Sequence, residues 1–320
     1  MHEFVPRHVP VLLAETMNAL APRAGGHYLD GTLGLGGHSL AILASAANSE
    51  ICGLDVDAEA MGLARKNLTA YGERVHYFHA SYSHFHDCLD ELGWSLLDGA
   101  MLDLGVSSMQ LDEAGRGFSF NSDAPLDMRM DRSGDARKAS DLVNGESFAW
   151  LRECIATLGE DPQAACIARH IVEARRQKPI STTSELARLV EESYPADWRH
   201  KSRRHPATRT FQALRMAVND ELGELRIFFD NILPRLAVGG RLVIIAFHSL
   251  EDRMVKMAMR RWARGCLCPA AATACVCGHQ PEVRVLFKKP LTAGPDELKR
   301  NPRASSAKLR AIEKIWERGN

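Results

Sequence analysis

The sequence predicts an α/β fold in which a doubly wound, mostly parallel sheet is interrupted by an inserted all-helical domain. Short apolar segments alternate with helical patterns from the N-terminal region to residue 104. The alternation stops over residues 114–216, where no convincing strand is found, and an apolar segment returns at Leu242–Phe247. Strands that alternate with helices form parallel sheets covered by helices, so these observations indicate one sheet with a helical insertion.

The first part of the chain contains the first four strands of this sheet. Each predicted strand is a short run rich in apolar residues, and a helical pattern separates it from the next. The predicted strands are 27–33, 51–55, 75–79 and 97–104, and the predicted helices are 8–20, 38–47 and 58–68.

The middle of the chain predicts three capped helices. Ser147 can cap a helix that extends to residue 158, and Asp161–Pro162 can start another that extends to about residue 177. Thr183 can cap a third, to about residue 193. We therefore predict a helical domain over 114–216, inserted into a domain formed by 1–113 and 217–320.

The sheet resumes after a long helical stretch that ends near Leu236. Gly239–Phe247 predicts the fifth strand, and Val283–Phe287 predicts another. Ser306–Ile312 predicts either a strand or a helix, because a short apolar segment fits both.

The formal net charge is zero, but the charges are unevenly distributed along the chain. Residues 1–115 contain 5 Lys and Arg against 15 Asp and Glu, and residues 116–320 contain 35 against 25. This asymmetry predicts a polyanionic partner for the later part, with scattered solvated charge as the alternative. No signal peptide is visible, and no apolar run approaches the roughly 18 residues of a membrane helix. We therefore expect a cytoplasmic protein with no membrane partner.

The most informative segment is Leu29–Ser39, where a short strand leads into a glycine cluster and then into a helical pattern. Glycines allow the backbone to approach a ligand closely, and the N–H groups at a helix start bind polar or anionic groups. Asp55 ends the second strand, where a carboxylate can accept hydrogen bonds from ribose hydroxyls. The two features predict a site for an adenosine-containing cofactor.

The glycine pattern distinguishes between cofactors. A dinucleotide site requires G-x-G-x-x-G/A, but Ser39 occupies the position of the third glycine. The pattern is closer to the D-x-T-x-G-x-G loop typical of S-adenosylmethionine (SAM) methyltransferases. A plain structural turn and an NAD-dependent oxidoreductase are the alternatives.

Polar residues gather at the ends of the predicted strands, beyond which open α/β sheets bind their ligands. Asp103 ends the fourth strand before a glycine turn, so we expect it to face the ligand, with a turn or capping acid as the alternative. Tyr82 can pack on an adenine ring or lie half exposed in the core. No G-x-S-x-G nucleophile elbow surrounds Ser249, beside His248, which argues against hydrolase chemistry.

The insertion carries the candidate RNA-binding residues. Aromatic and arginine side chains over 118–130 can stack on a flipped or single-stranded base, with a hydrophobic plug as the alternative. A basic cluster over 196–216 can contact phosphates, with a solvated basic face as the alternative. A second basic cluster covers 284–310. The expected RNA-binding residues are Phe118, Arg129, Arg199, Lys201, Arg203, Arg204 and Arg209.

Four of the eight cysteines form two C-x-C pairs, Cys266 with Cys268 and Cys275 with Cys277. Four thiolates can hold zinc, but the C-x-C spacing is tighter than the usual C-x₂₋₄-C. We therefore expect free thiols and no essential metal, with a structural zinc site as the alternative.

The order of these motifs resembles that of the bacterial ribosomal small-subunit methyltransferase H family, over nearly the whole chain. So many ordered motifs make a chance match very unlikely. The motifs are His8–Leu13, Asp30–Thr32, Gly36–Ser39, Leu102–Ser108, Arg116–Phe120, Pro125–Met130, His205–Gln212, Phe247–Arg253 and Asn301–Ala304.

The resemblance implies a class I SAM-dependent methyltransferase that methylates N4 of a cytidine in 16S rRNA. It implies a cytoplasmic protein that acts on assembled small-subunit rRNA and allows a homodimer. Some members of the family lack the clustered cysteines. The cofactor-binding residues implied by the family are Gly36, Gly37, His38, Asp55, Tyr82, Asp103 and Gln110.

The cytosine N4 lone pair is delocalised into the ring, so an acceptor for an N4 proton would assist its attack on the methyl group. The D/N-P-P-Y/F motif of DNA amino-methyltransferases is replaced here by Asp103–Val106. We rank Asp103 first as the proton acceptor, His248 second and Asp127 third. An RNA-binding assembly protein that retains the fold without turnover is the remaining alternative, disfavoured by the intact cofactor motifs.

Overall fold

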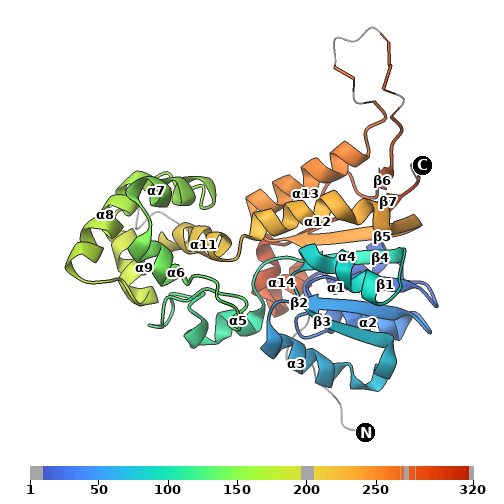
Figure 1. Cartoon of the computed structure of the whole chain (residues 1–320), viewed down its shortest axis with the longest axis horizontal. Coiled ribbons are helices and arrows are strands. Elements are labelled where there is room, and N and C mark those ends of the chain that lie inside the picture. The colour runs from blue at the N-terminus through green and yellow to red at the C-terminus, as the bar shows by residue number, and fades with distance from the viewer. Residues whose placement is uncertain (1–9, 196–204, 267, 270–273, 278, 317–320) are drawn as a thin grey trace. The chain divides into compact units, whose positions relative to one another are not determined.

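The computed structural model describes residues 10–195, 205–266, 268–269, 274–277 and 279–316. They form two compact units, of which one is Met1–Gly105 with Glu224–Asn320 and the other is Val106–Gly223 (Figure 1). The second unit extends beyond the predicted insertion at both ends, because Val106, Leu111 and Val218 pack on its apolar core. The helices within the described ranges include none long and apolar enough to cross a membrane.

The first unit contains a seven-stranded sheet with the order β3-β2-β1-β4-β5-β7-β6. The strands from β3 to β5 are parallel, whereas β7 runs antiparallel to both β5 and β6. The prediction of a doubly wound, mostly parallel sheet is therefore confirmed. The strands are β1 (His27–Asp30), β2 (Glu50–Asp55), β3 (Val75–His79), β4 (Leu97–Asp103), β5 (Leu236–Ala246), β6 (Val283–Val285) and β7 (Lys308–Lys314).

The strand order reverses between β1 and β4, because the chain first proceeds from β1 to β3 and then returns to the other side of β1. In open α/β sheets the ligand binds at such a switch point, beyond the carboxyl ends of the strands. The segments after Asp30 and Asp103 therefore define where a ligand site is expected.

Both faces of the sheet are covered by helices. Successive residues of β4 point to opposite faces, so Leu102 belongs to one buried cluster and Met101 to the other. The first cluster includes residues of α4 (Phe85–Glu91), α12 (Glu221–Arg235) and α13 (Ser249–Trp262). The second includes residues of α1 (Leu13–Leu20), α2 (Gly37–Ser45) and α3 (Ala58–Asn67). The short helices η1 (Thr69–Arg74), η2 (Tyr82–His84), α14 (Pro295–Arg300) and η4 (Pro302–Ser306) complete this unit.

The second unit is built from helices around its own apolar core, which includes Ile155, Ile167 and Leu214. In its described residues, strand-like pairing is limited to one bridge between Pro125 and Thr182. Its helices are α5 (Ser108–Asp112), η3 (Ala114–Arg116), α6 (Ala139–Gly145), α7 (Phe148–Thr157), α8 (Ala164–Gln177), α9 (Thr183–Glu192) and α11 (Ala207–Val218).

Of the three helix starts predicted in the second unit, that of α7 is confirmed and those of α8 and α9 are wrong. Ser147 caps α7 by accepting the N–H of Trp150. However, α8 begins only at Ala164, because Asp161 accepts the N–H of Gln163 within a preceding turn.

Thr182, rather than Thr183, caps α9. The hydroxyl of Thr183 instead donates to the carbonyl of Ser122. The ambiguous segment near the C-terminus is the strand β7.

Candidate functional site

The loop after β1 is fixed by the buried carboxylate of Asp30. Its Oδ2 accepts the hydroxyl of Ser39 at 2.7 Å, which ties the first turn of α2 to the end of the strand. Burial, the largest influence, raises the pKa of Asp30 although this hydrogen bond lowers it. Thr32 Oγ1 accepts the backbone N–H of Asp103 at 2.6 Å, so the ends of β1 and β4 are joined at the switch point. Sequence analysis assigned no role to Asp30 or Thr32, although both lie in the glycine-loop pattern.

Two of the predicted cofactor-binding glycines are required by the shape of this loop. Gly36 has a φ of 80° and forms the N-cap of α2, which has no side-chain cap. A Cβ on Gly37 would lie 2.4 Å from Cγ of Pro10, closer than real Cβ contacts allow. The uncapped N-terminus of α2 therefore presents its backbone N–H groups without side chains that would block a ligand.

Asp55 lies half-buried beneath the same loop at the end of β2. Its Oδ2 accepts the N–H of Gly34 at 2.7 Å, and its Oδ1 accepts the N–H of Asp57 at 2.8 Å. Burial raises the pKa of Asp55 to about 6, against the two backbone hydrogen bonds, which lower it. The carboxylate is thus held in one orientation and keeps lone pairs for further donors.

His38 and Asp103 form the least satisfied polar pair of the site. Nε2 of His38 lies 3.5 Å from Oδ2 of Asp103, and the two side chains are 7% and 23% exposed. Within the described residues, both ring nitrogens of His38 and Oδ1 of Asp103 have no hydrogen-bond partner. Buried polar atoms are normally paired, so these atoms fit a polar ligand that supplies the missing partners.

Tyr82 follows β3 and is half-buried beside the site. Its ring contacts Phe228 edge to face, with centroids 5.8 Å apart. Ser81 and Ser83, on either side of it, both donate hydroxyl hydrogen bonds to Glu224, which fixes this turn. A Cβ on Gly31 would lie 2.9 Å from Cβ of Tyr82, so the aromatic residue lies against the glycine loop.

His248 caps α13 at the carboxyl end of β5. Its Nδ1 accepts the N–H of Glu251, and its Nε2 lies 3.1 Å from Oε1 of Glu251. Glu251 is 2% exposed and accepts the N–H groups of Phe247 and His248. Glu251 is not among the site residues predicted from the sequence. Its position three residues after the capping residue is typical of a capping box and could have identified it. The ring of His248 thus caps α13 through Nδ1, whereas its Nε2 is buried and makes no hydrogen bond with the described residues.

In the second unit, Asp127 and Arg129 pair with each other. Nε and Nη2 of Arg129 donate to Oδ1 and Oδ2 of Asp127 at 2.7 and 3.1 Å. Burial acts to raise the pKa of Asp127, but the hydrogen bonds and charge of Arg129 hold it below its ordinary value. Between them, Met128 is fully buried and has a φ of 63°. This strained conformation is held by the N–H of Met128, which donates to Arg116, and by its carbonyl, which accepts from Asn219.

The other predicted residues of the second unit have different environments. Phe118 is 9% exposed and packs in the apolar core, which favours the hydrophobic-plug alternative. Gln110 is buried, and its Oε1 accepts the N–H of Ser107 in the capping box of α5. Arg209 is exposed and donates to the carbonyl of Glu160. Arg199, Lys201, Arg203 and Arg204 lie outside the described residues.

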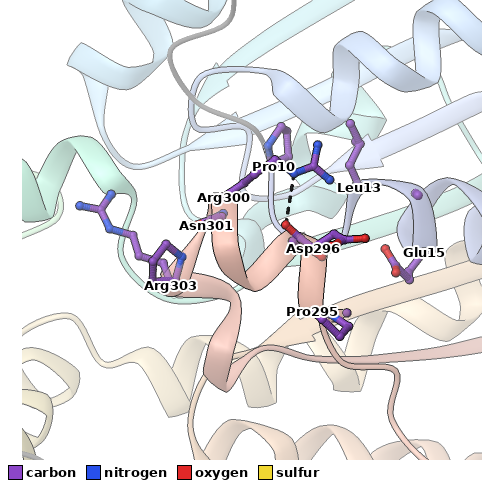
Figure 2. A pocket seen from close by; sticks show the side chains of 12 residues that line it. Pro10, Leu13, Glu15, Pro295, Asp296, Arg300, Asn301 and Arg303 are labelled. Carbon is purple, nitrogen blue, oxygen red and sulfur yellow. Dashed lines mark hydrogen bonds between the residues drawn. The ribbon is translucent and has the colours of Figure 1, made fainter.

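A cavity of about 670 Å³ lies between the start of α1 and the segment α14–η4 (Figure 2). Pro10, which contacts Gly37, forms part of its wall, so the cavity adjoins the glycine loop. Arg300 and Arg303 also line it, and Nε of Arg300 donates to the carbonyl of Asp296 (Figure 2). The predicted second basic cluster therefore contributes two guanidinium groups beside the candidate site.

Known proteins are similar in sequence to nearly the whole of this chain. A family model described as the MraW methylase family matches residues 6–315. "Ribosomal RNA small subunit methyltransferase H" of Desulfovibrio desulfuricans is 65% identical over 311 residues, which cover 97% of this chain and 95% of that protein. The proteins of the same name from Nitratidesulfovibrio vulgaris (strain DP4) and Lawsonia intracellularis are 60% and 52% identical, over 96% of this chain and 95% and 99% of those proteins. The likeness thus includes the residues of both compact units.

Proposed function

Because this chain belongs to the MraW methylase family, we propose that it is an enzyme that transfers the methyl group of SAM to N4 of a cytidine in 16S rRNA. The observation that carries the proposal is the contact between His38 and Asp103 at the switch point of the sheet, where both ring nitrogens of His38 and Oδ1 of Asp103 are buried and make no hydrogen bond with the described residues. The names of the relatives, ribosomal RNA small subunit methyltransferase H, support methyl transfer to the ribosomal RNA of the small subunit.

We assign the cofactor to the carboxyl ends of β1, β2 and β4. Asp55 accepts hydrogen bonds from the ribose hydroxyls, because its carboxylate is oriented by two backbone N–H groups. The uncapped N-terminus of α2, with Gly36, Gly37 and His38, faces the polar end of the ligand, and Tyr82 packs against the adenine ring. When bound, SAM supplies an electrophilic methyl group on its sulfonium. The contribution of Gln110 remains a prediction.

Asp103 is the proton acceptor that the geometry favours among the three candidates. Its Oδ1 and Nε2 of His248 both lack a hydrogen-bond partner within the described residues, but Nδ1 of His248 is used to cap α13, and Asp127 is paired with Arg129. A carboxylate that accepts an N4 hydrogen localises the nitrogen lone pair as the nitrogen attacks the methyl carbon. With SAM and the RNA bound, Asp103 would accept the N4 proton while the nitrogen takes the methyl group from the sulfur of SAM, which would leave as S-adenosylhomocysteine.

His38 positions Asp103 in this scheme. Its Nε2 lies 3.5 Å from Oδ2 of the carboxylate, so Oδ1 is left for the substrate. Positioning and electrostatics supply most of the remaining rate enhancement, because the nucleophile and the methyl group need only approach in line.

RNA binding is assigned to the helical unit and to the basic C-terminal segment. Arg209 is exposed on α11, and Arg300 and Arg303 line the cavity beside the glycine loop. Guanidinium groups bind phosphates by charge and hydrogen bonding, so they suit an RNA backbone. Since ribosomal subunits are the substrate, we place the protein in the cytoplasm. A homodimer remains an untested prediction.

Two measurements test this proposal. Calorimetric titration should detect binding of SAM and no binding of NADH, which distinguishes the methyltransferase from an oxidoreductase. Transfer of labelled methyl groups to small subunits from a strain that lacks the protein should then occur at catalytic enzyme concentrations. SAM binding without transfer would instead indicate an assembly protein, and binding of NADH alone would refute the cofactor assignment.

A further inference from the structure

Four cysteine side chains lie close together between α13 and β6. The sulfur atoms of Cys266, Cys268, Cys275 and Cys277 all lie within 4.8 Å of one another. Sγ of Cys275 lies 3.4 Å from that of Cys266 and 3.6 Å from that of Cys277, and the Cys277–Cys266 distance is 3.8 Å. The short C-x-C spacing led us to expect no metal here, but the reversal of the chain joins the two pairs into one cluster.

These distances are those of a tetrahedral metal site. Four thiolates at the zinc–sulfur distance of about 2.3 Å lie about 3.8 Å apart when arranged as a tetrahedron. Three of the sulfur–sulfur distances, 3.4, 3.6 and 3.8 Å, are close to this value. A disulfide requires a sulfur–sulfur distance of about 2.05 Å, and all eight cysteines are free thiols in the structure.

Backbone N–H groups point at two of the sulfur atoms. The N–H of Cys268 donates to Sγ of Cys266, and the N–H of Val276 donates to Sγ of Cys268, each at 3.4 Å. Such hydrogen bonds stabilise thiolate over thiol, and they orient the ligands around a metal. The loop therefore supplies both the donor atoms and the polar groups that support them.

Packing does not explain why cysteines occupy these positions. Cys266, Cys275 and Cys277 are exposed, and Val276 between two of them is 88% exposed. By contrast, Cys52, Cys88 and Cys154 are buried, as is usual for cysteines that serve as small apolar residues. Four thiolates without a cation would also repel one another at these distances.

We propose that Cys266, Cys268, Cys275 and Cys277 bind one Zn²⁺ ion as a structural site, independently of the methyl-transfer reaction. All four positions of a tetrahedral ion are occupied by protein sulfur, which leaves no open position for catalysis. Binding replaces the thiol protons by the metal, so the four thiols release up to four protons per ion. The ion then holds the two C-x-C pairs together.

Elemental analysis of the full-length protein, purified without a histidine tag and without added zinc or chelator, tests this proposal. We expect about one zinc per chain in the native protein and in Cys166→Ala, a control cysteine in α8. The double variant Cys266→Ser/Cys268→Ser should contain at least tenfold less zinc.

Cobalt provides a second readout that does not require the variant to fold. Titration of the metal-free native protein with Co²⁺ should give the thiolate-to-cobalt charge-transfer bands and the tetrahedral d–d bands of a four-sulfur site. Addition of Zn²⁺ should abolish both sets of bands.

Zinc well below one per chain together with the absence of these bands would overturn the proposal. So would stoichiometric iron in place of zinc, or disulfides among the four cysteines by mass spectrometry of protein kept under reducing conditions.

Discussion

Replacement of Asp103 by Asn tests the assignment of the proton acceptor. The change keeps the size of the side chain and one acceptor oxygen but removes the charge. The backbone N–H that donates to Thr32 is unaffected, and the side chain makes no hydrogen bond with the described residues. Only the 3.5 Å contact with His38 is altered, so we expect the free energy of unfolding to change by less than about 1 kcal/mol.

The effect on turnover should be much larger than the effect on folding. General base catalysis contributes about 10²–10⁴-fold, so kcat at saturating SAM should fall by about this factor. The corresponding increase in the activation barrier is about 2.7–5.5 kcal/mol. Single-turnover transfer of labelled methyl groups to small subunits measures the rate, and calorimetry measures SAM affinity on the same preparation.

Asp55→Asn is the matched control, because Asp55 also ends a strand at this edge of the sheet. It should weaken SAM binding by about 1.5–3 kcal/mol, the contribution of a charge-assisted hydrogen bond, and leave kcat at saturating SAM nearly unchanged. If Asp103→Asn instead lowers SAM affinity and kcat/KM equally, with kcat intact, Asp103 is only a cofactor ligand and the proposed mechanism is wrong.

Three further predictions concern other parts of the molecule. Burial raises the pKa of Asp55 to about 6, so this carboxyl becomes protonated as the pH falls through 6 and accepts fewer hydrogen bonds. SAM affinity measured by calorimetry should therefore fall below pH 6, and Asp55→Asn should remove the part of this pH dependence that is due to Asp55. The same pH profile in Asp55→Asn and in the native protein would contradict the assignment of Asp55 to the ribose. Asp127→Ala leaves the guanidinium of Arg129, whose side chain is 13% exposed, without its carboxylate partner, and should destabilise the protein by about 3–5 kcal/mol in urea unfolding. The more exposed pair Arg137–Glu146 is the control, because Arg137→Ala should cost about 0–1 kcal/mol. Equal losses of unfolding free energy in the two variants would refute the argument. Replacement of Arg199, Lys201, Arg203 and Arg204 by Ala should make the slope of log affinity for the subunit against log salt concentration shallower by up to about 3 units, without a change in SAM binding. An unaltered slope would place the RNA surface elsewhere, first at the basic segment 284–310.

The centre of the sheet could be predicted from the sequence because its strands β1, β2 and β4 are short runs that are mostly buried. Val75–His79 is a strand as expected, and Asp55 and Asp103 end the strands at which the sequence placed them. The limits of some helices depend on contacts with distant residues. Leu12 has a φ of 52°, and its N–H donates to Glu297, so α1 begins only at Leu13. No local pattern signals this contact.

Part of the candidate site could also be predicted from the sequence. Topology alone brings the ends of β1, β2 and β4 to one edge of the sheet, but the approach of His38 to Asp103 depends on packing of the loop. The pairing of Asp127 with Arg129 depends on the left-handed conformation of Met128, which methionine rarely adopts. Sequence spacing likewise does not show that the four sulfur atoms of the two C-x-C pairs lie within 4.8 Å of one another.

Identification of the methylated nucleoside tests the central claim most directly. Small subunits from a strain that lacks this protein are incubated with the enzyme and SAM that carries a deuterated methyl group, and the rRNA is digested to nucleosides for mass spectrometry. The account predicts a labelled cytidine with the methyl group on N4, about one per subunit, and none with Asp103→Asn in the same time. A label on carbon 5, on the ribose or on another base would contradict it, as would the absence of label with an enzyme that binds SAM.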